Sequence, residues 1–297
     1  MKTNAIIRII AWSLVIVVLL GVLFVFTLGK SFFLKGIVLG SSPEASKAAV
    51  SLEEAAMHVN APGESIEIDA DQIRDLNIVW AAGKILIQPA DVPSIEISET
   101  EVEDAKHAML WKVSGNKLTI RFQEDTTLGF GINIGDALNK DLTILVPKDW
   151  KCGTLEIDAA AADLEVSGLE IKEVEFDGAS GVCEFNNCVV DQLDLDTASG
   201  NVTFTGSLDV LDCDAASANV IAVLENIPSR IDMDSMSGDL DLTLPENAGF
   251  TVTMDGMSSE FDSDFETSIK NGKYVCGDGS CRISVDGMSG DVIIRKG

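Results

Sequence analysis

The sequence predicts an all-β protein, a single-stranded parallel β-solenoid with about 19 to 21 residues per coil behind one N-terminal transmembrane helix. Three observations predict this fold. A short motif recurs seven times between residues 157 and 294. Apolar and polar residues alternate on both sides of each copy, as they do in half-buried strands. Residues 9–29 carry no charge and are mostly aliphatic, as expected of a membrane span.

The N-terminus consists of a short basic head, residues 1–8, followed by the apolar span, residues 9–29. As a helix this span would be about 31 Å long, which matches the hydrocarbon core of a bilayer. No small-x-small cleavage site follows it, so the sequence predicts an uncleaved, single-pass anchor in the cytoplasmic membrane. Because the head offers no domain to translocate, the C-terminal domain is expected to be extracellular.

A juxtamembrane linker is expected over residues 30–62. Ser42, Pro43 and Glu44 are typical of a helix start, so a short helix through Met57 is expected within it. The N-terminal β coils of the solenoid should then occupy residues 63–150. The regular seven-copy solenoid should occupy residues 151–297.

Each copy of the repeat joins two alternating stretches through small turn residues, as in LDTASG at residues 195–200. Gly and Ser suit a tight corner, and a nearly constant repeat length implies that successive coils stack in parallel. The copies begin at Ile157, Phe176, Leu195, Cys213, Met233, Met254 and Val285, at intervals of 19, 19, 18, 20, 21 and 31 residues. The long last interval predicts a capping hairpin near residues 266–283, with its turn at residues 277–280.

Two columns of residues form a predicted structural turn ladder. They are the aspartates Asp158, Asp177, Asp196, Asp214, Asp234, Asp255 and Asp286 and the serines Ser180, Ser199, Ser217, Ser237, Ser258 and Ser289. Carboxylates about 5 Å apart repel, so these aspartates should either cap turn amides or share cations such as Ca²⁺. Capping is favoured because the repeats lack the Gly-Gly-x-Gly-x-Asp pattern of calcium solenoids. We therefore predict no metal site and no cofactor.

The serine column is not expected to be catalytic. A serine nucleophile needs a positioned base, and the only histidines are His58, in the linker, and His107, in an acidic loop. Turn formation explains these serines.

The six cysteines show no C-x-x-C metal spacing. Cys276 and Cys281 flank the predicted hairpin turn and are a candidate cross-strand disulfide if the domain is exported. Cys183 and Cys213 fall on inward positions and are expected to be buried thiols.

The chain carries a net charge of −27, from 48 acidic and 21 basic side chains. Four of the bases lie in residues 1–35, which hold no acid, so the remainder has 17 bases against 48 acids. Such a surface repels phosphate backbones, which argues against nucleic acid as a partner. Cations or basic partners fit better, and the alternative is that the charge only keeps an exposed repeat protein soluble and unaggregated.

The order of three strand-like segments, residues 82–87, 115–120 and 141–147, followed by D-x-x-S-G coils, resembles a known family. It is the bacterial putative-adhesin domain-of-unknown-function family of β-strand repeat proteins, and the resemblance covers residues 65–297. It implies a β-solenoid in the cell envelope with a role in surface adhesion or envelope-stress signalling. The family supplies no catalytic residues to carry over.

These observations lead to the expectation of a membrane-anchored, non-catalytic envelope protein. It would be an adhesin-like or envelope-stress scaffold or sensor that binds an envelope protein or glycan through its solenoid faces. The alternative is a Ca-stabilised, surface glycan-binding or glycan-cleaving solenoid. A sugar cleft normally contains aromatic residues, whereas Trp80, Trp111 and Trp150 all precede the repeats, so an enzyme is not expected.

Overall fold

The computed structural model describes residues 57–100, 105, 107–122 and 139–297. The predicted membrane span and nearly all of the predicted linker lie outside these residues. Among the residues described, none belongs to a helix with the length and apolar character needed to cross a bilayer.

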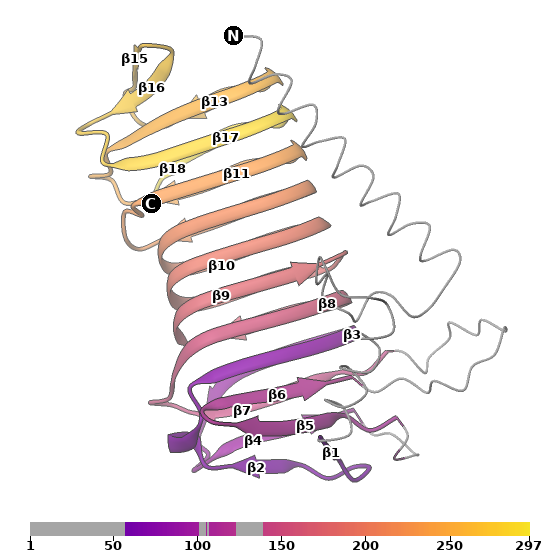
Figure 1. Cartoon of the computed structure of the whole chain (residues 1–297). Helices are drawn as coiled ribbons and strands as arrows, with labels where there is room; N and C mark the ends of the chain where they lie inside the picture. Colours follow the sequence, from indigo (N-terminus) through magenta and orange to yellow (C-terminus); the bar gives the residue numbers. More distant parts are fainter. Residues whose placement is uncertain (1–56, 101–104, 106, 123–138) are drawn as a thin grey trace, which may run out of the picture. The chain divides into compact units, whose positions relative to one another are not determined.

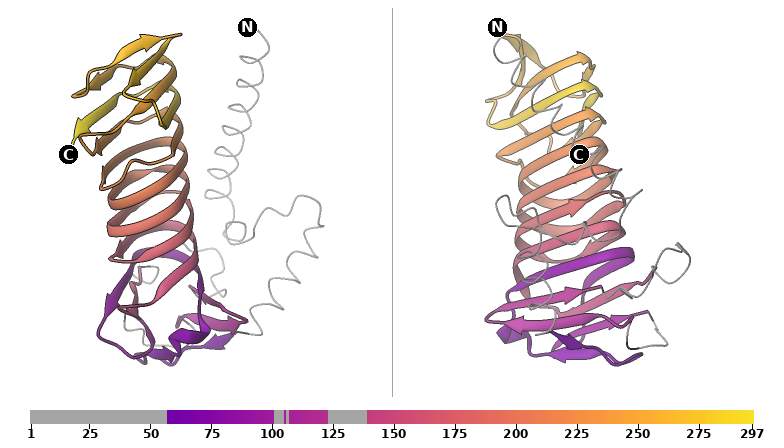
Figure 2. Two further views of the ribbon diagram at one scale, coloured as in Figure 1. Left: turned by 90° about the vertical axis from the view of Figure 1, so that its left-hand side faces the viewer. Right: turned by 45° about the vertical axis from the view of Figure 1, so that its right-hand side comes forward.

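The described part is all-β, as predicted, and its strands form one hydrogen-bonded sheet that winds into a stack of coils (Figures 1 and 2). Its only helical segment is one 3₁₀ turn, Ala70–Gln72. The strands of the N-terminal part are β1 (His58–Val59), β2 (Ile66–Ile68), β3 (Asp75–Ala90), β4 (Ile95–Glu99), β5 (Leu110–Ser114), β6 (Lys117–Arg121), β7 (Leu142–Pro147) and β8 (Lys151–Ser167). Those of the repeats are β9 (Glu170–Gly178), β10 (Val182–Leu224), β11 (Arg230–Ser237), β12 (Leu240–Leu244), β13 (Phe250–Ser258), β14 (Phe261–Ser263), β15 (Ser268–Lys270), β16 (Lys273–Cys276), β17 (Cys281–Ser289) and β18 (Val292–Lys296).

Each coil has two arms joined at a corner. The first arm enters the repeat motif and the second arm leaves it, as β11 and β12 do in one coil. Successive coils pair in parallel, first arm on first arm and second arm on second arm. The predicted parallel stacking is therefore confirmed for these coils.

The core fills the space between the two arms. Within β8 the inward residues Leu155, Ile157, Leu164 and Val166 are buried, while the residues between them are more exposed. This alternation follows from the two-residue period of a strand, whose side chains point to opposite faces of the sheet. A single coil cannot bury its apolar side, so the fold depends on the stack.

At the C-terminal end, the order of coils in space differs from their order in the sequence. Asp286 of β17 pairs with Asp234 of β11 on one side and with Asp255 of β13 on the other. Strand β18 likewise lies between β12 and β14. The last coil is thus inserted between two earlier ones, and Figure 1 shows β17 between β11 and β13.

The same exchange occurs at the N-terminal end. Ile78 of β3 pairs with Ile120 of β6 on one side and with Ile157 of β8 on the other. The second arm of β3 lies in the same way between β7 and β8. Strand β3 comes first in the sequence, but Figure 1 shows it inside the stack.

The predicted hairpin turn at residues 277–280 is wrong. The hairpin is made by β15 and β16, with Lys270 opposite Lys273 and the turn at Asn271 and Gly272. Both turn residues have positive φ values, 52° and 78°, which Asn and Gly tolerate. Residues 277–280 instead carry the chain past the end of β13, from β16 on one side to β17 on the other.

A buried ion pair ties the N-terminal coils together. The Nζ atom of Lys140 lies 2.8 Å from Oε2 of Glu99, and both side chains are buried. The same ammonium donates to the carbonyl oxygen of His107 and lies over the rings of Phe122 and Trp80. Burial lowers the pKa of Lys140, although Glu99 opposes that shift. The repeat pattern gave no indication of this cluster.

Candidate functional site

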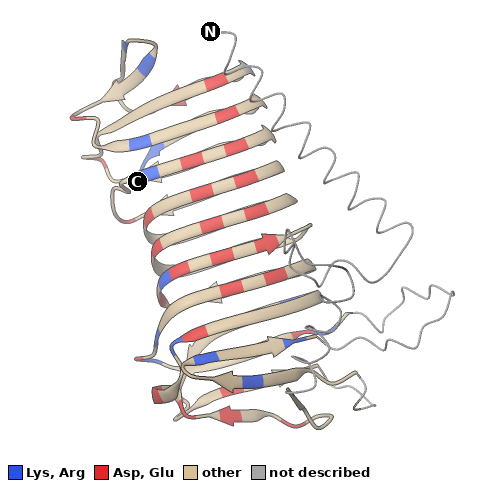
Figure 3. Cartoon of the chain, viewed as in Figure 1, with Lys and Arg blue, Asp and Glu red and all other residues tan. Residues whose placement is uncertain are grey.

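The outward side chains of the first arms form two acidic columns, which we call the acidic face. One column contains Glu156, Glu175, Asp194, Asp212 and Asp232, and the other contains Asp158, Asp177, Asp196, Asp214, Asp234, Asp286 and Asp255 in spatial order. The predicted aspartate ladder is therefore in register, with its last two members exchanged. Figure 3 shows the two columns as red bands on successive coils.

Basic residues pair with both ends of the first of these columns, but not with the carboxylates in the middle of the face. At one end Nζ of Lys117 lies 2.8 Å from Glu156. At the other, Arg230 contacts Asp232 at 2.6 Å and Asp212 at 3.3 Å. Between them lie five carboxylates that form no ion pair with any described Lys or Arg: Glu175, Asp177, Asp194, Asp196 and Asp214. The middle of the face is thus the part with unbalanced negative charge.

The pKa values reflect this difference. Burial, together with the neighbouring carboxylates, raises the pKa of Asp196 to about 6. The same two causes raise the pKa of Asp177 and Asp214. Burial opposes ionisation of Glu156 as well, but hydrogen bonds from Lys117 and Asn77 lower its pKa overall. A depression of about 100 Å³ lies among the carboxylates around Phe176.

Stability should therefore fall as pH rises through about 6. The folded-state pKa of Asp196 exceeds the unfolded value of about 3.9, so protonation favours the folded state. We expect the free energy of unfolding from urea titrations to be higher at pH 5 than at pH 7.5. At pH 7.5, Asp196→Asn should raise it by up to about 1 kcal/mol, a figure reduced for solvent screening. Asp149→Asn, an exposed change outside the acidic face, should have no such effect, and equal effects of the two variants would contradict the prediction.

Four aspartates of the ladder, Asp158, Asp177, Asp196 and Asp214, accept no hydrogen bond from a described corner amide, contrary to the expectation. No hydrogen bond to another described residue contributes to the pKa of Asp158, Asp177, Asp196 or Asp214. Their side chains are exposed on the outer surface of the first arms. The capping role is taken by a column that sequence reasoning missed.

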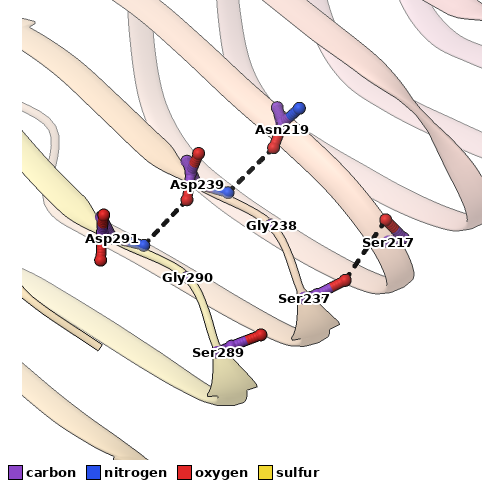
Figure 4. A pocket seen from close by; sticks show the side chains of 8 residues that line it. All are labelled: Ser217, Asn219, Ser237, Gly238, Asp239, Ser289, Gly290 and Asp291. Carbon is purple, nitrogen blue, oxygen red and sulfur yellow. Dashed lines mark hydrogen bonds between the residues drawn. The ribbon is translucent and has the colours of Figure 1, made fainter. Parts of the chain in front are cut away.

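That column lies five residues after the aspartates. Oδ1 of Asn219 accepts the backbone N–H of Asp239 at 3.0 Å, and Oδ1 of Asp239 accepts that of Asp291 at 2.9 Å (Figure 4). Asp163 accepts from Val182 in the same way. The recurrence of Asp or Asn at this spacing in most copies was the signal that could have identified it.

The serine column follows the same corner. Ser237 pairs in register with Ser217 and Ser289, and the hydroxyls of Ser217 and Ser237 are 3.4 Å apart. Ser258 pairs with Ser289, and the backbone N–H of Ser199 donates to Ala179. Ser180 lies at the equivalent corner position in an earlier coil. An open groove of about 410 Å³ runs along the serines and the capping residues (Figure 4).

The two histidines lie away from these serines. The ring of His58 packs against Trp111 at 4.8 Å, and His107 contributes its carbonyl oxygen to Lys140. Among the described residues, no group of three or more His, Cys, Asp or Glu side chains is arranged to hold a metal ion.

All six cysteines are buried free thiols. Cys276 and Cys281 both pair with Phe250, one on each side of it, so they do not face each other across a hairpin. Two strand spacings separate them by about 10 Å, beyond the Cα–Cα reach of a disulfide. The cross-strand placement expected for this pair is therefore wrong. Burial raises the pKa of Cys183, Cys213 and Cys281 to about 12, which makes these thiols unreactive.

Comparison with known proteins finds one matching family model and several similar solved structures. The family model described as Toastrack DUF4097 matches residues 73–295. No curated protein matches the chain. Among solved structures, a putative cell adhesion protein from Clostridium sporogenes is similar at 9% identity, with 80% of this chain and 100% of that chain covered and a TM-score of 0.35. A putative adhesin from Bacteroides fragilis is similar at 14% identity, with 78% and 97% covered and a TM-score of 0.36. A putative lipid binding protein from Parabacteroides distasonis is similar at 14% identity, with 80% and 97% covered and a TM-score of 0.35.

Proposed function

The chain belongs to the Toastrack DUF4097 family, and from this premise we propose that it is a non-catalytic, adhesin-like binding protein of the cell envelope. In this proposal the acidic face binds a positively charged protein segment, and residues 9–29 hold the domain at the cytoplasmic membrane. The solenoid serves as a rigid support that presents the face outside the cell.

The observation that carries the proposal is the unbalanced middle of the acidic face. Its five carboxylates lie on three successive coils, and the coils are about 4.8 Å apart. Burial and mutual repulsion raise the pKa of Asp194 and Asp196 in the free protein. A cationic partner would reduce the repulsion between these carboxylates. This reduction would make a favourable contribution to the free energy of binding.

The shape of the face also favours a protein segment over a small molecule. The columns run along flat strands, and the depression among them holds only about 100 Å³. Pockets for small ligands are typically several times larger and mostly apolar. An extended basic segment laid across the coils would meet two carboxylates on each coil.

Titration of the full chain with a lysine-rich peptide tests this proposal. The peptide is expected to bind within residues 57–297. Isothermal titration calorimetry should show binding that weakens at least tenfold between about 50 mM and about 500 mM NaCl, because exposed charges are screened. The triple variant Asp177→Asn, Asp196→Asn, Asp214→Asn should lose most of this binding.

A matched control removes the same charge elsewhere. The triple variant Asp149→Asn, Glu246→Gln, Glu266→Gln changes three exposed acids outside the acidic face. It should keep binding within about twofold of the original chain. Equal losses in both triple variants would mean that only net charge matters, and the acidic face would then have no specific role.

The proposed topology has its own test. Protease added to intact cells should digest the solenoid domain while the cells stay sealed, and deletion of residues 9–29 should release the domain from the membrane fraction. A domain that is protected until the cells are lysed would contradict the extracellular placement. It would leave the peptide-binding result unaffected.

A further inference from the structure

We infer that β17 and β18 lock the C-terminal end of the solenoid, so that its outer coils open together rather than fraying one after another. In a stack built in sequence order, the last coil has one neighbour and a free end. When this last coil detaches, only one interface between coils is broken, and the whole terminal segment becomes a free tail. The inserted coil of this chain is held differently.

Hydrogen-bonded pairing holds the inserted coil on both of its sides. β17 pairs in parallel with β11 over residues 230–237 and with β13 over residues 250–258. β18 pairs in parallel with β12 and with β14. Removing this coil would therefore break two interfaces at once, as it would for a coil in the middle of the stack.

Side chains reinforce both interfaces. Arg295 forms a bidentate pair with Asp241 of β12, with Nη2 at 3.0 Å from Oδ2. The next residue bonds to the opposite side, since the backbone N–H of Lys296 donates to Asp264 and its ammonium lies 5.1 Å from the ring centroid of Phe265. β18 is thus fastened to both neighbouring coils within two residues.

The corner repeats this arrangement. The backbone N–H of Asp291 donates to Asp239 of the inner coil, and Oδ1 of Asp291 accepts the backbone N–H of Glu260 in the outer coil. The inward side chains Val292 and Ile294 are fully buried. The inserted coil therefore has the polar and apolar contacts of a coil in the interior of the stack.

The outer coil, β13 and β14, gains little conformational entropy if it detaches alone. β13 and β14 are tethered through residue 244 at one end and residue 281 at the other, each of which belongs to a paired strand. If they detach, residues 245–280 form a closed loop rather than a free tail. A closed loop gains less conformational entropy than a free tail does. Separate detachment is therefore disfavoured both for the inserted coil and for the outer coil.

Hydrogen exchange followed by mass spectrometry on the full chain tests the lock. We expect the amides of residues 281–296 to exchange no faster than those of residues 253–263, although they come later in the sequence. Faster exchange of residues 281–296 is the order that a simple stack would give, and it would overturn the inference.

Two adjacent isoleucines provide a matched pair of variants. Ile294→Ala removes a fully buried side chain, whereas Ile293→Ala changes its partly exposed neighbour on the same strand. Ile294→Ala should accelerate exchange in residues 253–263 and in residues 281–296 by about tenfold or more, with residues 189–205 unchanged. Ile293→Ala should accelerate neither segment.

A milder change keeps the test informative if Ile294→Ala fails to fold. Ile294→Val should give the same pattern with a smaller acceleration. Acceleration confined to residues 281–296 in either variant would show that the outer coil is held independently, and the lock would be refuted.

Discussion

Replacing Lys140 with alanine is expected to lower the free energy of unfolding by about 3–5 kcal/mol, because it leaves the Glu99 carboxylate buried without its cation. The side chain of Glu99 is only 2% exposed, so bulk water does not solvate this carboxylate in the folded protein. The backbone N–H of Met109 would still donate to Glu99, at 2.7 Å. A whole domain is stable by about 5–15 kcal/mol, so this loss would be visible as a clear shift in urea denaturation.

Lys148→Ala is the matched control for this prediction. Nζ of Lys148 lies 3.9 Å from Asp91, and both side chains are exposed. Exposed pairs contribute between zero and about 1 kcal/mol, so this variant should change stability by about 0.5 kcal/mol or less. The double variant Lys140→Met, Glu99→Gln removes both charges and should recover much of the loss. Similar losses in Lys140→Ala and Lys148→Ala would show that the buried pair adds nothing beyond an exposed one.

The sequence predicted the family, the all-β class and the register of the aspartate column, and each of these is confirmed. The reason is that a strand has a strict two-residue period. Once Leu193 and Leu195 are assigned to the core, Asp194 and Asp196 must face outward, and equal repeat lengths bring them beside Glu175 and Asp177. The register of such a stack therefore follows from the alternation of apolar and polar residues and from the repeat length.

The order of coils could not be predicted in this way. Asp286 pairs equally well with Asp234 and Asp255, because every copy of the motif offers the same partners. The only indication was the interval of 31 residues before the last copy, which is long enough for the chain to pass one coil and return. The Asn271-Gly272 pair was likewise a stronger hairpin signal than residues 277–280.

The buried cluster around Lys140 lay beyond sequence reasoning for a different reason. Its members Glu99, His107 and Phe122 come from separate segments without a shared period. Only the exchanged position of β3 brings these segments together around Trp80, whose Nε1 donates to the carbonyl oxygen of Lys140 at 2.7 Å. Contacts that depend on the order of coils are predictable only after that order is known.

Gly206→Ala is expected to destabilise the fold by about 3 kcal/mol or more, because the corner at this residue has no room for a methyl group. A Cβ atom on Gly206 would lie 2.1 Å from the carbonyl oxygen of Cys188, which is backbone and cannot rotate away. The φ angle of +122° adds strain for any residue with a side chain. A shift of the corner would disturb the hydrogen bond in which the carbonyl oxygen of Gly206 accepts the N–H of Glu225 in the next coil.

Gly272→Ala separates the two causes of that loss. Gly272 also has a positive φ, +78°, but a Cβ atom there would have no neighbour within 4 Å. This variant should therefore show strain alone, about 1 kcal/mol, in the same urea titrations. A loss several times larger for Gly206→Ala would mean that the spacing between coils, about 4.8 Å, is fixed by the stack and not by the local backbone. Equal losses would mean that neighbouring coils can move apart at a corner to make room for the methyl group.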